Sequence, residues 1–125
     1  MPIIESKSQL LEYFNQGAKR QDQLLIGVEH EKFALNKKTL KPLSYGGIGG
    51  ISDIFNQLIN LGWSPIKEGI PEKTIALKRN AEFITLEPGG QIELSGAPLN
   101  NIHQTCSETT NHLNEMKKIS DVGKE

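Results

Sequence analysis

Two acidic segments have the residue types and spacing that metal-dependent chemistry requires. Glu29 and Glu31 lie within Gly27-Val28-Glu29-His30-Glu31-Lys32-Phe33, and Glu87 and Glu93 flank Pro88-Gly89-Gly90. Because side chains alternate along a strand, Glu29 and Glu31 are expected on one face. Carboxylates inside strand-like apolar segments are usually paired or bound to metal. Several of them on one face predict a hard divalent cation such as magnesium. For Glu29 and Glu31 taken alone, a solvated acidic edge strand explains the spacing better.

The segment around Pro88-Gly89-Gly90 also predicts a strand register. If these three residues form a hairpin loop, Glu87 faces Gln91 and Thr85 faces Glu93, and an apolar face lies behind them. A two-residue loop would instead place Glu87 on the same face as apolar side chains, because a one-residue slip inverts every side chain. The sequence therefore favours the three-residue loop, with Glu87 and Glu93 sharing a polar face.

The bulk properties are those of one ordinary domain. The chain has 125 residues and a formal net charge of -1, which argues against nucleic-acid binding. Cys106 is the single cysteine, so no internal disulfide can form. No apolar run approaches membrane-spanning length, and the first residues lack a signal-peptide pattern. We therefore expect no membrane association and a cytoplasmic location.

Hydrophobic periodicity and turn residues predict helices at both ends of a strand-rich chain. A capping box of Ser6 and Gln9 begins a first helix that stops at Gly17, and Ser52 is predicted to cap a second helix. A long strand is expected over residues 24–36, with residues 40–45 pairing back. Four short strands follow, over 63–68, 74–79, 83–87 and 91–95. Their short links predict antiparallel pairing.

The last element is predicted as a helix over residues 101–122, capped by Asn100 or Asn101 and stopped by Gly123. An apolar stripe at three-four spacing is expected to pack on the sheet. It consists of Ile102, Cys106, Thr109, Leu113 and Met116.

The acidic segments resemble those of the plant and proteobacterial type of glutamate–cysteine ligase. The matching residues are Gly27-Val28-Glu29-His30-Glu31-Lys32-Phe33, and Ile84-Thr85-Leu86-Glu87-Pro88-Gly89-Gly90-Gln91-Ile92-Glu93-Leu94-Ser95-Gly96-Ala97-Pro98-Leu99 with His103-Gln104-Thr105-Cys106. The resemblance implies an α+β fold, an antiparallel sheet flanked by helices that is part of a glutamine-synthetase-like catalytic fold. It also implies magnesium and ATP as cofactors, glutamate and cysteine as substrates, and gamma-glutamyl phosphate as the intermediate. By the same resemblance, Glu29, Glu31, Glu87 and Glu93 are the metal ligands.

Members of that family are several times longer than this chain. Residues 1–125 are therefore expected to be the amino-terminal portion of a catalytic domain, inactive alone, and to associate with a complementing carboxyl-terminal chain or with themselves. The alternative is a non-catalytic remnant that binds metal or a partner. Lys78 and Arg79 are the nearby cations that could reach phosphate, and an exposed strand end explains them equally well.

Overall fold

The computed structural model describes residues 3–121 and has an α+β architecture built on one five-stranded antiparallel sheet. The strand order is β1-β5-β4-β3-β2. The strands are β1 (Glu29–Phe33), β2 (Ser64–Glu68), β3 (Lys73–Arg79), β4 (Glu82–Glu87) and β5 (Gln91–Ser95). The helices are α1 (Lys7–Gly17), α2 (Ile51–Asn60) and α3 (Ile102–Asp121), with short 3-10 turns η1 (Gln21–Gln23) and η2 (Pro88–Gly90). The predicted antiparallel α+β fold is confirmed.

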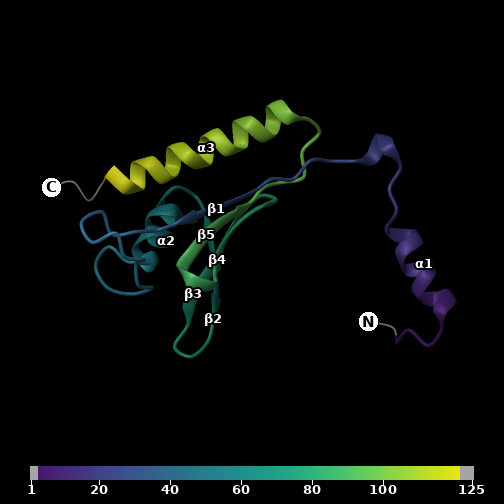
Figure 1. Ribbon diagram of the computed structural model, residues 1–125, viewed down its shortest axis with the longest axis horizontal. Coiled ribbons are helices and arrows are strands. Elements are labelled where there is room, and N and C mark those ends of the chain that lie inside the picture. Colours follow the sequence, from purple (N-terminus) through teal and green to yellow (C-terminus); the bar gives the residue numbers. More distant parts are fainter. Residues whose placement is uncertain (1–2, 122–125) are drawn as a thin grey trace.

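The hydrophobic core joins α2 and α3 to one face of the sheet, whereas α1 stands apart at the end of an extended segment (Figure 1). Phe55 and Leu58 of α2 are fully buried, as are Leu77, Ile84 and Leu94 from the three central strands. Trp63, which follows α2, is only 2% exposed. No residue of α1 is buried. Within residues 3–121, no helix is long and apolar enough to cross a membrane.

The hairpin between β4 and β5 has the register predicted from its sequence. Glu87 pairs with Gln91, and Thr85 pairs with Glu93. The loop needs glycine because Gly89 and Gly90 have φ angles of 79° and 77°, a region in which side chains with a Cβ are strained. The three-residue loop therefore fixes which face each glutamate occupies.

The helix starts were predicted in part. The capping box of Ser6 and Gln9 is present at α1, and Asn101 caps α3 by accepting a hydrogen bond from the Gln104 N–H. Ser52 does not cap α2, whose N-cap is Gly50. A Cβ at Gly50 would lie 2.8 Å from the Gly46 carbonyl oxygen, so the tight loop excludes a larger capping residue. The predicted helix stop at Gly123 lies outside the described residues.

The first strand is shorter than predicted. The expected strand over residues 24–36 is reduced to β1, flanked by isolated bridges from Ile26 to Leu99 and from Leu35 to Pro42. A strand extends only as far as its partner does, and β5 supplies five residues for pairing. The expected return of residues 40–45 is correspondingly limited to the bridge at Pro42 and two hydrogen bonds. The Leu43 N–H donates to the Ala34 carbonyl, and the Asn36 N–H donates to the Lys41 carbonyl.

The predicted sheet-facing stripe of α3 is largely wrong. Ile102 and Leu113 are 56% and 45% exposed, and Cys106 is exposed as well. The buried residues of the helix are Thr105, Glu108, His112 and Ile119. The helix thus turns a face with three polar residues toward the sheet, of which Glu108 accepts a hydrogen bond from the Ala97 N–H. Of the predicted stripe, only Met116 packs against the core.

Candidate metal site on the acidic sheet face

Four glutamates lie on the sheet face opposite α2 and α3, which we call the acidic face. Glu31 of β1 pairs directly with Glu93 of β5, and Glu29 pairs with Ser95, one step along the same face. On the other side of β5, Glu87 pairs with Gln91. Glu93 therefore occupies the centre, with Glu31 directly across from it and the other two at diagonal positions. All four side chains therefore belong to one sheet face.

The surroundings of these carboxylates leave their oxygens available. Glu29 and Glu31 are exposed, whereas Glu87 and Glu93 are half-buried. Glu93 Oε1 accepts a hydrogen bond of 3.2 Å from the Ser95 hydroxyl. Among residues 3–121, none of the four forms a salt bridge. Uncompensated carboxylates on one face are suitable ligands for a hard cation.

The arrangement fits an open magnesium site better than an enclosed one. Directly opposed residues of an antiparallel pair have Cβ atoms roughly 4.5–5.5 Å apart, and diagonal neighbours are about 7–8 Å apart. Over the described part of the chain, no three His, Cys, Asp or Glu side chains converge closely enough to hold an ion. Magnesium usually takes one or two carboxylates and completes its shell with water and substrate phosphates. Glu31 and Glu93 could supply such a pair, and ligation by all four residues stays a prediction.

The two cations at the end of β3 lie on opposite faces. Lys78 pairs with Phe83, which pairs in turn with Ser95, so Lys78 belongs to the acidic face. Its Nζ atom lies 5.4 Å from the centre of the Phe83 ring. Arg79 turns to the helix side, where Nη1 donates a 2.6 Å hydrogen bond to Glu115 and the guanidinium covers the Trp63 ring at 4.2 Å. Lys78 is therefore the one of this pair that could contact a phosphate on the acidic face.

Burial lowers the pKa of two basic groups of β1 that lie on the helix side of the sheet. Burial and the charge of Lys32 lower the pKa of His30, and burial lowers the pKa of Lys32. His30 thus lies on the face opposite the acids, and its ring packs edge-on against His112 at 6.2 Å between ring centres. Both basic groups lie on the side of β1 that faces α3.

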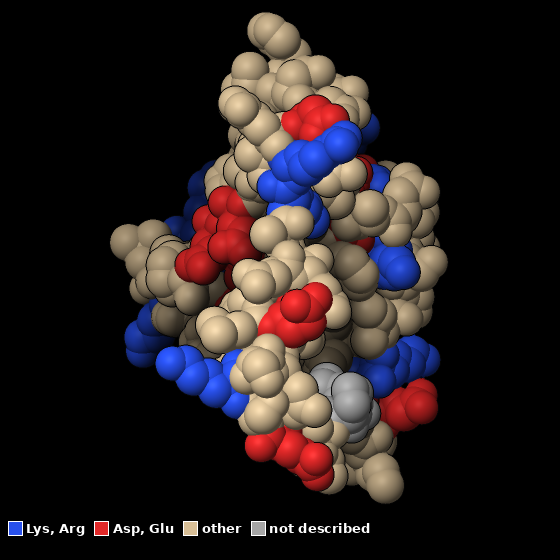
Figure 2. All heavy atoms as spheres, turned by 90° about the vertical axis from the view of Figure 1, so that its right-hand side faces the viewer, with Lys and Arg blue, Asp and Glu red and all other residues tan. Residues whose placement is uncertain are grey.

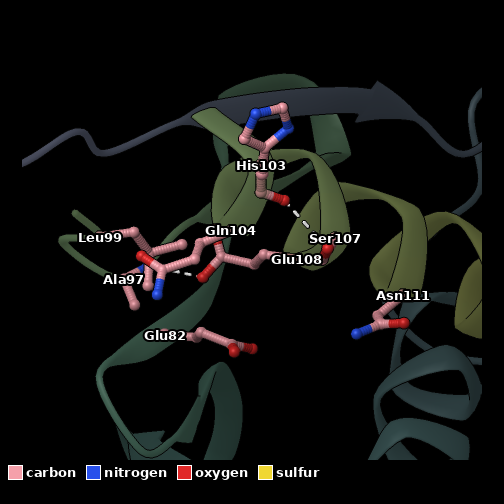
Figure 3. A pocket seen from close by; sticks show the side chains of 8 residues that line it. All are labelled: Glu82, Ala97, Leu99, His103, Gln104, Ser107, Glu108 and Asn111. Atoms are coloured by element: carbon pink, nitrogen blue, oxygen red, sulfur yellow. Dashed lines mark hydrogen bonds between the residues drawn. The ribbon is translucent and has the colours of Figure 1, made fainter. Parts of the chain in front are cut away.

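Two other candidate ligand sites lie elsewhere. The glycine-rich loop before α2 has two backbone N–H groups that are already used in internal hydrogen bonds and so are not free to bind a phosphate. The Gly49 N–H donates to the Asp53 carboxylate, and the Gly50 N–H donates to the Gly47 carbonyl. A shallow pocket lies on the helix side, beside Glu82 and the first turns of α3 (Figure 3).

Acidic and basic side chains are interspersed over the face viewed in Figure 2, so that face carries no extended field of one sign.

The chain belongs to the glutamate–cysteine ligase family 2 (GCS2), whose sequence pattern matches residues 25–123. It is 41% identical over 120 residues to the chloroplastic glutamate–cysteine ligase of Arabidopsis thaliana, covering 93% of this chain and 22% of that enzyme. The tomato enzyme (Solanum lycopersicum) is 41% identical over 117 residues, and glutamate–cysteine ligase B of japonica rice (Oryza sativa) is 42% identical over 117 residues. These matches cover 93% of this chain and 21% and 23% of the two enzymes. The chain thus spans less than a quarter of the length of these relatives.

The relatives correct the prediction of a cytoplasmic location. All three are named chloroplastic enzymes. The prediction relied on a single cysteine and on the lack of a signal-peptide pattern in the first residues. A lone cysteine indicates a reducing environment at most, and it does not distinguish the cytosol from other reducing compartments.

Proposed function

We propose that residues 1–125 form the amino-terminal, metal-binding portion of a plastid glutamate–cysteine ligase. The complete enzyme would join the gamma-carboxylate of glutamate to the amine of cysteine at the expense of ATP, in the first step of glutathione biosynthesis. The observation that carries this proposal is the placement of Glu29, Glu31, Glu87 and Glu93 on one sheet face in a chain of this family.

The chemistry explains why such a face would be needed. A carboxylate does not react directly with an amine, so ATP would first convert it to gamma-glutamyl phosphate, and the cysteine amine would then displace phosphate. The terminal phosphate of ATP carries charge that must be neutralised before a second anion can approach it. Magnesium supplies that neutralisation when it is bound. The carboxylates of the acidic face would hold the ion, and Glu93 is central to them.

Lys78 would act at the other end of the same face. Lys78 is paired across the sheet with Phe83, Phe83 with Ser95, and Ser95 with Glu29. Lys78 and Glu29 are therefore three strand spacings apart on the same face. Neighbouring strands lie about 4.8 Å apart, so this distance is roughly 14 Å. An extended triphosphate held by a metal at the carboxylates could bring a phosphate oxygen toward the Lys78 ammonium. Lys78 would then add a point charge that holds the phosphate chain along the sheet.

The second candidate function is a non-catalytic module that binds metal or a partner. It is favoured by the uncovered acidic face and by the positions of β1 and β2 at the two edges of the sheet. Edge strands present unpaired N–H and C=O groups that can pair with another chain. A complementing carboxyl-terminal chain or a second copy would both satisfy these groups.

Manganese titration followed by NMR tests the metal site. Mn²⁺ replaces magnesium at oxygen sites and broadens nearby amide signals. We expect selective broadening in β1, β5 and the end of β4, removed by excess magnesium and strongly reduced in Glu93→Gln. Glu12→Gln, on the exposed helix α1, is the matched control and should bind manganese as the wild type does. Broadening that survives Glu93→Gln unchanged would contradict a site on this face.

A further inference from the structure

The most unusual buried group of the described chain is His112 on α3. Its side chain is 1% exposed, and neither ring nitrogen has a hydrogen-bond partner among residues 3–121. Buried polar atoms nearly always have partners, so a bare imidazole at the interface between helix and sheet calls for a physical explanation. A neutral ring tolerates such a site because it carries no net charge, whereas an imidazolium would lose its hydration without replacement.

The neighbours of His112 make its protonation more costly. His30 of β1 faces it at 6.2 Å between ring centres, and Lys32 lies on the same side of that strand. Arg79 of β3 adds a further positive charge, and Glu115 on the next turn of α3 is the attractive group. Glu115 is already engaged by Arg79 and by the Trp63 indole. Glu108, one turn earlier, accepts a 2.7 Å hydrogen bond from the Ala97 N–H.

We propose that His112 makes the docking of α3 on the sheet sensitive to pH, so that the helix is held while the imidazole is neutral and released when it is protonated. Burial, Lys32 and His30 lower the pKa of His112 to about 4, compared with 6.5 for an ordinary histidine. Because the pKa in the docked state is the lower one, the stabilisation is complete above pH 6.5 and is lost as the pH falls toward 4.

Release of α3 would affect the acidic face, because the strands that the helix covers carry two of the glutamates on their other side. The helix covers the apolar face that includes Ile84 and Leu94, and these strands carry Glu87 and Glu93 on the other side. Undocking would expose that apolar surface and loosen the two strands. The structure thus connects an acid-sensitive group at the back of the sheet with the carboxylates at its front.

Trp63 reports directly on this docking. It is the single tryptophan of the chain, and its indole N–H donates a 3.3 Å hydrogen bond to Glu115 of α3. We would follow its fluorescence between about pH 7.5 and pH 4.5 in the wild type and in His112→Gln, which replaces the ring with a group that does not titrate. His103→Gln is the matched control, because His103 is exposed on the same helix.

In the wild type and in His103→Gln, the equilibrium constant for opening should rise on the order of a hundredfold over this range, shifting Trp63 emission to the red. In His112→Gln the midpoint should move to lower pH, because the titrating ring of His112 is gone and only the contribution of His30, whose pKa burial also lowers, is left at this interface. A midpoint equal to that of the wild type in a folded His112→Gln variant would overturn the proposal.

Proton NMR of the wild-type ring signals keeps the proposal testable if His112→Gln does not fold. We expect the His112 signals to titrate only as α3 is released. Titration of His112 near its ordinary pKa with α3 still docked would overturn the proposal equally.

Discussion

Replacing Glu93 by glutamine should stabilise the protein in the absence of metal. Glu93 lies directly across from Glu31, with Glu29 and Glu87 at diagonal positions, and none of the four has a salt-bridge partner among residues 3–121. Two like charges about 6 Å apart repel by roughly 0.7 kcal/mol in water, and by more where water is partly excluded. Directly opposed like charges on neighbouring strands cost roughly 0.2–1 kcal/mol. We therefore expect the free energy of unfolding to rise by about 0.5–1 kcal/mol, or roughly 2–4 °C in melting temperature.

The assay is thermal or urea unfolding of the wild type, Glu93→Gln and the control Glu12→Gln, each with and without magnesium and at low and high salt. The stability gain should shrink at high salt, because exposed charges are screened. Added magnesium should stabilise the wild type and Glu12→Gln by mass action and have little effect on Glu93→Gln. A loss of stability in metal-free Glu93→Gln, together with an unchanged response to magnesium, would refute both the repulsion and the metal role.

Three further variants and one control variant test the geometry, each by urea unfolding or nucleotide titration. Gly89→Val should lower the free energy of unfolding by about 1–2 kcal/mol, because φ is 79° there and a residue with a Cβ is strained in that region. No neighbouring atom lies within 4 Å of the added Cβ, so the loss would come from the backbone alone. An unchanged stability would argue against the strained loop. Gly96→Ala should cost about 1–3 kcal/mol by displacing the buried Glu108 carboxylate, whereas Gly27→Ala, with open space around it, should cost much less. Lys78→Met should weaken binding of magnesium–ATP several-fold and leave manganese binding intact, and equal weakening of both would point to a general loss of structure.

The sequence predicted the structure best at the hairpin between β4 and β5, where the loop residues and the alternation of polar and apolar side chains indicate the same register. The Pro88-Gly89-Gly90 loop predicted the β4–β5 register residue by residue, because only one loop length keeps the apolar side chains on a common face. That register also placed Glu87 and Glu93 together. The pairing of β1 with β5, which places Glu31 opposite Glu93, was not predicted from the residues, because sequence spacing carries no information on which distant strands become neighbours.

The buried face of α3 was predicted wrongly because of how the helix packs. An apolar stripe through Cys106 and Leu113 predicted the wrong face of α3, because the helix instead turns Glu108 and His112 toward the sheet. These polar side chains are four residues apart and so share a helix face, which was the available signal. Hydrophobic periodicity overlooks such a face when polar groups on it gain hydrogen bonds, as Glu108 does from Ala97.

The most direct measurement of the central claim is a ligation assay by complementation. The 125-residue chain would be purified and mixed with the remaining carboxyl-terminal portion of the Arabidopsis relative, and gamma-glutamylcysteine would be measured with ATP, magnesium, glutamate and cysteine. We predict no product from the chain alone, ATP- and cysteine-dependent product from the mixture, and loss of that product with Glu93→Gln but not with Glu12→Gln. Ligation by the mixture that is unaffected by Glu93→Gln, or robust ligation by the chain alone, would contradict the account.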